Sequence, residues 1–575
     1  MIDLKISTLR ALMSAAAMAL VLAACGGGGS GSDPSGGTSG SIASPNVSSA
    51  TAGSASVTLS WANVTSAVSY NLYWSTTPGV SKANGTKIPD IGSPYTHAGL
   101  TFGNTYYYVL TAVDANGAES AESPQVSAAP LALPAGWSSG TKIGLDRSTS
   151  TGIYPASAHI NDAGNAVVSW GEVGSGTTNG YAYANAYAGG IWRTPTRLGD
   201  LGSFSASVAV TASGDAIAVY GQRVLDAVTG FTLRTAINSS RYDHLTDTWS
   251  VAQQVSVSSL ANSVAGDPSV AVDANGNAIA IWIEDGQTWA RRFDAALGTW
   301  EASATKLSTM QITFVSPPKI VVDGSNIFTA VWIEESAAPG ATKNNATVFA
   351  RRFNATPNVW DATVRIGQDP LGMLGNLDGA VDPWVDVNSA GNVVVVWEQT
   401  NTLVNNGYQY SIDSARFDPV AKTWSPHVAL TARSAIVYRP RVAVDNAGNA
   451  MAIWQQSEAV GLSLQSVRFS AAGGTWSAPM LTDQTGTGTI VTTALGMDSS
   501  GNAEVIWTEN PGGIVERRYD AATNTWSAFN KTLQPGSGAL IAAMSDTGYV
   551  ALLSQSTDFS VIPWKVAARG WIRSP

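Results

Sequence analysis

Glutamate or glutamine recurs at one place in a repeated phrase, and a carboxylate held beside an arginine is a pair that could transfer protons. The position lies two residues beyond the end of each copy, at Glu172, Gln222, Glu284, Glu334, Gln399, Gln456, Glu509 and Gln555. A second phrase carries Arg241, Arg292, Arg352, Arg416, Arg468, Arg518 and Arg569 at a matching place, with Ala186 in the first copy. If the two phrases form neighbouring strands, they pair Glu284 with Arg292, Glu334 with Arg352 and Glu509 with Arg518.

The repetition of this pair indicates architecture instead of catalysis. A general acid or a nucleophile needs a carboxylate at one special copy, whereas half of these positions hold a neutral amide. A feature that is present in every copy is expected to support the fold. The sequence therefore assigns no catalytic residue.

Other reactive groups are sparse. His97, His159, His244 and His427 are scattered, and the sequence holds neither a His-Glu-x-x-His motif nor a Gly-x-Ser-x-Gly motif. The repeated turn Asp273-Ala274-Asn275-Gly276-Asn277 lacks the alternating carboxylates and the distal Glu of a calcium loop. We expect no metal and no cofactor. The net charge of −10 argues against nucleic acid as a partner.

The repeated phrases predict the elements that position these side chains. The phrase at 272–282 returns in eight copies, which end at Trp170, Tyr220, Trp282, Trp332, Trp397, Trp454, Trp507 and Leu553. Each copy has two apolar strand patterns around an Asp-x-x-Gly-Asn turn, and the arginine phrase adds a second hairpin. Four strands per repeat at this spacing predict an all-β fold with a β-propeller over 133–575. Eight four-stranded blades are preferred, with seven as the alternative, and residues 137–145 are expected to supply the outer strand of the last blade.

The candidate ligand site is the rim where the innermost strands begin. The connections that reach this face of the predicted propeller are long and irregular, and such loops on a repetitive scaffold concentrate binding. The residue types near the starts of the innermost strands also differ from one copy to the next. They are His159, Asp267, Lys319, Asp382, Trp384, Arg439 and Arg441.

The N-terminus reads as an export signal. An apolar run follows Lys5 and Arg10, and it ends in Leu22-Ala23-Ala24-Cys25-Gly26. This stretch resembles the lipobox of bacterial lipoproteins, which implies that residues 1–24 are removed and that Cys25 is lipidated. Gly26 after Cys25 resembles the signal for the outer membrane of a Gram-negative cell, so the expected partner is the membrane, through a lipid anchor. Residues 25–43 are rich in Gly and Ser, as a flexible tether is.

Residues 44–131 alternate in hydrophobicity as strands do. Val57, Leu59 and Trp61 share one face, and the stretch from Leu100 to Tyr106 has the form of a tyrosine corner. With Trp61, Tyr70 and Tyr106, the segment resembles a fibronectin type III domain, although Phe102 replaces the usual Pro. The resemblance implies a sandwich of seven strands whose aromatic residues form the core.

These features favour a surface-tethered, non-enzymatic binding or scaffold lipoprotein. Its long-loop face would bind a glycan or a protein, on the periplasmic or the outer side of the outer membrane. The alternative is a glycoside hydrolase or a sialidase-like propeller enzyme that acts on extracellular carbohydrate. This alternative depends on fold analogy alone.

Overall fold

The computed structural model describes residues 42–573 outside a set of short segments. The segments left out are 54–55, 99, 101–103, 130–140, 145–146, 149–151, 174–179, 227–231, 258–261, 310–315, 337–344, 368–378, 403–407, 433–435, 459–460, 485–488, 511–512, 528–529, 534–539 and 559–564. The predicted signal peptide, residues 1–24, and the predicted lipidation site Cys25 lie outside the described residues. The regular elements are strands, so the predicted all-β class is confirmed. In the described part of the chain, no helix has the length and apolarity needed to cross a bilayer.

The first domain is a sandwich of two antiparallel sheets. One sheet has the order β1 (Val47–Gly53), β2 (Ser56–Trp61), β5 (Tyr95–Ala98), and the other has β4 (Thr86–Ile91), β3 (Ser69–Ser75), β6 (Tyr106–Val113), β7 (Val126–Ala128). The rings of Trp61 and Tyr70 meet edge to face at 5.2 Å in the core between the sheets. These are the seven strands that the resemblance implied, and their aromatic residues are buried as expected.

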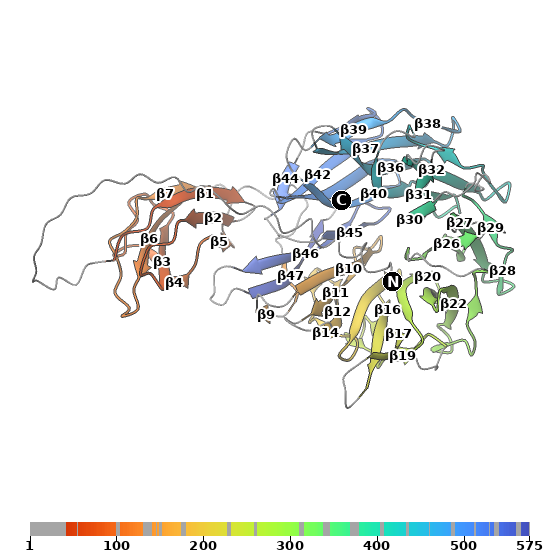
Figure 1. The fold of residues 1–575 in the computed structure, drawn as a ribbon, viewed down its shortest axis with the longest axis horizontal. Coiled ribbons are helices and arrows are strands. Elements are labelled where there is room, and N and C mark those ends of the chain that lie inside the picture. The colour runs from red at the N-terminus through yellow and green to blue at the C-terminus, as the bar shows by residue number, and fades with distance from the viewer. Residues whose placement is uncertain are drawn as a thin grey trace, which may run out of the picture. The chain divides into compact units, whose positions relative to one another are not determined.

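The rest of the described chain forms eight antiparallel units of five strands, each called a sheet below. Six of them are separate, and the fourth and fifth are joined into one ten-stranded sheet by a single parallel pair, Ala346 and Gly379. Their first strands are β10 (Gly152–Ile160), β15 (Ser203–Val210), β20 (Ala265–Val272), β25 (Lys319–Val322), β30 (Gly379–Val387), β35 (Val437–Val444), β40 (Thr489–Met497) and β45 (Leu540–Met544). Each first strand contacts the first strand of the next sheet, and β45 contacts β10. The first strands therefore surround a common axis, as in a β-propeller (Figure 1). Eight such units lie in the part of the chain that the structure describes, and the number of blades stays a prediction.

The second and third strands complete the broad part of each sheet. The second strands are β11 (Ala166–Val173), β16 (Ala216–Leu225), β21 (Ala278–Glu284), β26 (Ile327–Ser336), β31 (Val393–Thr402), β36 (Ala450–Glu458), β41 (Ala503–Asn510) and β46 (Val550–Asp558). The third strands are β12 (Gly180–Ala188), β17 (Thr232–Asp243), β22 (Gln287–Asp294), β27 (Asn345–Asn354), β32 (Tyr408–Asp418), β37 (Gly461–Ser470), β42 (Gly513–Asp520) and β47 (Lys565–Arg573). Two short strands pair with each third strand, such as β23 (Thr299–Trp300) and β24 (Thr305–Lys306) beside β22.

The repeated turn has the role that its sequence predicts. Asp273 Oδ1 accepts hydrogen bonds from the backbone N–H groups of Asn275 at 2.9 Å and of Asn277 at 2.8 Å. Gly276 adopts a φ of 80°, which a residue with a Cβ rarely does. The same aspartate bonds recur at Asp445 and Asp498, so the turn itself uses this carboxylate.

Strands from the two ends of the ring share its last sheet. Strand β8 (Thr141–Lys142) pairs with β47 through Arg569 and Gly570, and β9 (Arg147–Ser148) pairs with β47 through Lys565 and Val566. The prediction that residues before the first repeat complete the last sheet is thus confirmed. The pairing covers the edge of β47, which would otherwise present unpaired backbone groups.

The predicted Glu–Arg pairs are wrong, because the register of the hairpin separates their members. Glu284 lies opposite Gln287, whereas Arg292 lies opposite Ile279. Arg352 likewise lies opposite Thr329, while Glu334 lies opposite Thr347.

The third predicted pair fails for the same reason. Arg518 faces Glu504 instead of Glu509, and its Nε lies 3.3 Å from Glu504 Oε2. Glu509 lies opposite Gly513 in the backbone register, and its side chain lies outside the described residues.

The repeated Glu or Gln instead accepts the indole N–H of the buried tryptophan two residues earlier. The Nε1–O distances are 3.0 Å for Trp170 and Glu172, 2.9 Å for Trp282 and Glu284, 2.8 Å for Trp332 and Glu334, 3.1 Å for Trp397 and Gln399, and 3.3 Å for Trp454 and Gln456. Residues two apart on a strand share a face, so the pair is made within one strand. Glu and Gln serve equally because both present a carbonyl-type oxygen.

The repeated arginines link neighbouring sheets. Arg416 lies over Phe469 of the next sheet, with 3.6 Å from Cζ to the ring centroid, and Arg352 lies over Phe417 at 4.1 Å. Arg241 takes the same place over Phe293 at 4.7 Å. A guanidinium placed over the face of an aromatic ring is attracted by the negative charge density of that face. The repeated Glu or Gln and the repeated Arg therefore support the fold. They do so through contacts with aromatic side chains and not through the predicted Glu–Arg pairs.

Candidate functional site

Backbone irregularities mark the beginnings of the innermost strands. The pairing of the first and second strands shifts between Gly266 and Ser269 in the third sheet, and at the corresponding place in the fifth and sixth sheets. Asp267, Asp382 and Arg439 have φ values of 52°, 49° and 52° there. A proline follows each of them. Such bulges with left-handed residues redirect side chains and concentrate at functional sites.

Four of the predicted rim residues meet at this place. Lys319 Nζ lies 5.0 Å from the centroid of the Trp384 ring, and Arg441 Cζ lies 4.2 Å from the same centroid. Arg441 Nη1 also lies 3.4 Å from Asp382 Oδ2 and donates to Pro440 O at 2.7 Å. These residues come from β25, β30 and β35, which are neighbouring innermost strands. These four residues therefore lie together, and their part in binding a ligand stays a prediction.

Charged neighbours extend this group. Burial and the nearby Arg441 lower the pKa of Lys319 to about 8, against the effect of Asp382 and Asp267, which raise it. Burial raises the pKa of Asp267, although the charge of Lys319 lowers it. Asp267 thus belongs to the electrostatic surroundings of Lys319. Strongly shifted pKa values of this kind gather where ligands bind or react.

Glu398 is a member of the site that the sequence analysis missed. Its Oε1 accepts the backbone N–H of Arg439 at 2.7 Å, and burial raises its pKa to about 7. The charge of Asp382 raises this pKa further, while Arg441 and Arg439 lower it. A signal was present, because Glu398 directly follows the repeat end at Trp397. The other seven copies hold Gly171, Gly221, Ile283, Ile333, Gln455, Thr508 and Ser554 at that place, and none of these is a carboxylate. We call Asp267, Lys319, Asp382, Trp384, Glu398, Arg439 and Arg441 together the Trp384 cluster.

His159 is not a member of this cluster. It is the eighth residue of the nine-residue strand β10, beside the turn that leads to β11, and not at the start of the strand. Its Nδ1 accepts the backbone N–H of Val210 in the neighbouring innermost strand at 3.2 Å. Ser157 Oγ accepts the N–H of Val208 in the same way. The rim assignment of His159 is therefore wrong, and its side chain joins two sheets.

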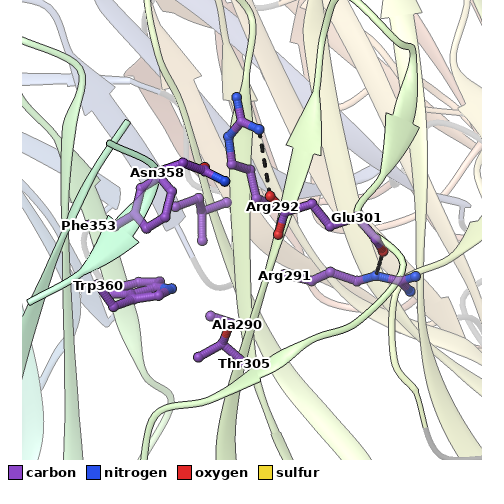
Figure 2. Close-up of a pocket in the computed structure, with 9 residues that line it drawn as sticks. Ala290, Arg291, Arg292, Glu301, Thr305, Phe353, Asn358 and Trp360 are labelled. Atoms are coloured by element: carbon purple, nitrogen blue, oxygen red, sulfur yellow. Dashed lines mark hydrogen bonds and ion pairs between the residues drawn. The ribbon is translucent and has the colours of Figure 1, made fainter. Parts of the chain in front are cut away.

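A small pocket lies at the joint between the third and fourth sheets (Figure 2). Its volume is about 70 Å³, and its walls include Phe353 and Trp360. Arg292 Nη1 lies 3.6 Å from Glu301 Oε1 and 3.4 Å from Asp294 Oδ2. Since a single water occupies roughly 10–15 Å³ of such space, the pocket has room for a few waters and not for a sugar ring.

Asp215, Asp243 and His244 place potential metal-ligand atoms within 4.8 Å of one another, in two turns of the second sheet. Asp215 Oδ1 accepts hydrogen bonds from the backbone N–H and from Nδ1 of His244, at 3.0 and 2.7 Å. Asp243 Oδ1 accepts the N–H of Leu245 at 2.8 Å. These bonds tie the two turns together and account for the grouping without an ion.

No family model matches the chain. An amylopullulanase of Thermoanaerobacter thermohydrosulfuricus is 45% identical over 92 residues, which are 15% of this chain and 6% of that protein. The chain thus spans a small part of the length of this relative.

Similar solved structures include a polysaccharide lyase of family PL25, an ulvan lyase. Its TM-score is 0.41 at 10% identity, with 69% of this chain and 100% of that chain covered. An α-L-arabinanase of Penicillium chrysogenum has a TM-score of 0.35 at 11% identity, with 76% and 98% covered. A protein of unknown function from Dyadobacter fermentans has a TM-score of 0.36 at 9% identity, with 75% and 99% covered. Likenesses this low carry no argument about function.

Proposed function

We propose that this chain is a tethered, non-enzymatic binding protein that takes a glycan at the Trp384 cluster. The observation that carries the proposal is the meeting of Lys319, Asp382, Trp384 and Arg441 on neighbouring innermost strands. A sugar hydroxyl donates one hydrogen bond and accepts others, so carboxylates and cations around one half-buried ring suit a polyhydroxylated ligand. The short match to an amylopullulanase supports a carbohydrate context.

A glycan array with the purified full chain tests this proposal. Trp384→Ala should weaken binding about tenfold or more, because truncation of a central aromatic side chain removes a large share of binding energy. Lys306→Ala is the matched surface control, since Lys306 is exposed in the outer strand β24. The proposal fails if the chain binds no glycan, or if the Trp384 variant binds as the unchanged protein does.

A glycoside hydrolase is the second candidate, and Glu398 favours it. A carboxyl group with a pKa of about 7 can act as a general acid, and the second carboxyl group Asp382 influences it. Chromogenic glycosides would report such an activity. Glu398→Gln should then abolish turnover while the protein stays folded. Glycan binding without turnover in the unchanged protein would exclude this candidate.

The tether is a proposal that rests on Cys25 and its flanks. We propose that the chain is an outer-membrane lipoprotein, in which residues 25–43 and a fibronectin type III domain hold the propeller away from the lipid. Cys25→Ser should abolish incorporation of labelled palmitate and move the protein out of the membrane fraction. A labelled, membrane-bound Cys25→Ser variant would contradict the proposal.

A further inference from the structure

The ammonium group of Lys319 lacks a polar partner in the part of the chain that the structure describes. It makes no hydrogen bond or ion pair there, and its Nζ lies over the Trp384 ring, 5.0 Å from the ring centroid. The side chain is half-buried. An ammonium that is taken out of water without an acceptor loses hydration free energy, and its lowered pKa reflects this loss. Such a group is satisfied when a ligand supplies an acceptor.

Arg441 places a second positive charge against the same ring. Its Cζ lies 4.2 Å from the ring centroid, and its charge helps to lower the pKa of Lys319. Asp382 offsets Arg441 in part, at 3.4 Å from Nη1, with a side chain that is 34% exposed. Neither Asp382 nor Asp267 forms an ion pair with Lys319 among the described residues. Two neighbouring cations, of which one has no counter-charge in contact, attract an anion.

The backbone holds both cations in place. Pro318 directly precedes Lys319, Pro440 precedes Arg441, and both prolines are buried. Proline fixes its own φ near −65°, so the backbone that leads into each of these two residues is restricted. Little ordering is then needed when a ligand binds, which favours affinity.

We propose that Lys319 and Arg441 bind a negatively charged substituent of the glycan, a carboxylate or a sulfate ester. This inference rests on the proposed function, because it names the class of glycan that the Trp384 cluster takes. The guanidinium can donate two parallel hydrogen bonds to the anion, and the ammonium supplies the donors that no protein group uses. The sugar ring then lies beside Trp384, Asp382 and Glu398.

Isothermal titration calorimetry on the full chain tests the inference with three polymers. Polygalacturonate carries carboxylates, dextran sulfate carries sulfate esters, and dextran is neutral. We expect one acidic polymer to bind at least about tenfold more tightly than dextran, with an affinity that falls as salt rises. The preferred acidic polymer identifies the substituent.

Variants of Lys319 separate this site from general charge effects. Lys319→Met should weaken binding of the preferred acidic polymer about tenfold, whereas Lys306→Met, at an exposed lysine, should change it less than about twofold. Lys319→Arg should restore binding. Because deprotonation of Lys319 removes its charge, the affinity of the unchanged protein should fall between about pH 7 and about pH 9.5. The affinity of Lys319→Arg should fall less over this range, since only the ionisation of Glu398 then acts against the anion.

The outcomes distinguish failure of the inference from failure of the proposed function. Equal binding of dextran and the acidic polymers, or a Lys319→Met variant that binds as tightly as the Lys306→Met control, overturns the inference and leaves glycan binding intact. If neither these polymers nor any glycan of the array binds, the proposed function fails. In that case thermal stabilisation by sodium sulfate or sodium acetate that is lost in Lys319→Met still supports the anion site, and its absence overturns the inference as well.

Discussion

Removal of the Glu334 carboxylate tests how the repeated Trp–Glu contact stabilises the propeller. The side chain is 1% exposed and accepts hydrogen bonds from Trp332 Nε1 at 2.8 Å, Thr309 N at 3.1 Å and Thr309 Oγ1 at 2.8 Å. Glu334→Ala removes the acceptor of the Trp332 indole N–H and of the Thr309 backbone N–H, and both groups are fixed in direction by the surrounding structure. Each buried donor left unsatisfied costs about 1–3 kcal/mol, so the loss of both bonds should lower the unfolding free energy by about 2–6 kcal/mol.

Glu334→Gln is the matched conservative change. It keeps one carbonyl oxygen for the indole N–H, as Gln399 does for Trp397 at 3.1 Å. We expect a loss of about 1 kcal/mol, because a charge-assisted bond becomes a neutral one. Glu301→Ala serves as the control, since its side chain is 38% exposed and its ion pair with Arg292 is 3.6 Å long. The control should change stability by less than about 1 kcal/mol.

Urea unfolding followed by tryptophan fluorescence measures these losses on the full chain. The reasoning is refuted if Glu334→Ala stays within about 1 kcal/mol of the unchanged protein, or if the Gln variant loses as much as the Ala variant. A double variant with Arg352→Ala adds a further check. Because Glu334 and Arg352 are not partners across the strands, the two losses should add within about 0.5 kcal/mol.

Three further predictions concern closure, protonation and the joints between sheets. Deletion of residues 141–148 removes β8 and β9 and exposes the edge of β47, so calorimetry should show a lower melting temperature with aggregation, and an unchanged melting curve would contradict the role in closure. The pKa of Glu398 is about 7 in the folded protein, above its ordinary value, so its contribution to stability is complete below about pH 4.5 and is lost as pH rises through 7. Urea titrations at several pH values should show this fall in the unchanged protein, and an equal fall in Glu398→Gln would refute the assignment. Arg416→Met should lose about 0.5–2 kcal/mol through its contact with Phe469, and urea unfolding should show no such loss for a variant of the exposed Lys306.

The sequence by itself determined the repeating plan of the molecule, because that plan depends on local rules. The Asp-x-x-Gly-Asn turns and the apolar strands around them predicted hairpins, and the surplus of strand patterns at the two ends predicted the closure at β47. The alternation around Trp61 and Tyr70 predicted strands there, whereas the sandwich itself was what the resemblance to fibronectin type III domains implied. In each of these cases, residues close in sequence decide the conformation of their own backbone.

The repeat pattern alone did not identify the side chain that each repeated Glu or Gln contacts. The spacing between Glu284 and Arg292 does not fix the register of a hairpin, because register depends on where the turn closes, and it closes at Asp285 and Gly286. The contact between Trp282 and Glu284 follows from the two-residue period of a strand and could have been foreseen. The stacking of Arg352 on Phe417 could not, since it joins separate sheets.

Only the tertiary structure decided which rim residues form a site. Asp267 and Arg441 are far apart in the chain, yet both influence Lys319, because β20, β25, β30 and β35 follow one another around the ring. The sequence grouped His159 with them because it is also near a strand end, but the chain direction of β10 puts it at the other end of the strand. Side chains from different sheets meet only where packing places them. For that reason only the tertiary structure showed the contact of Lys319 with Trp384 and, among the described residues, the lack of a polar partner for Lys319.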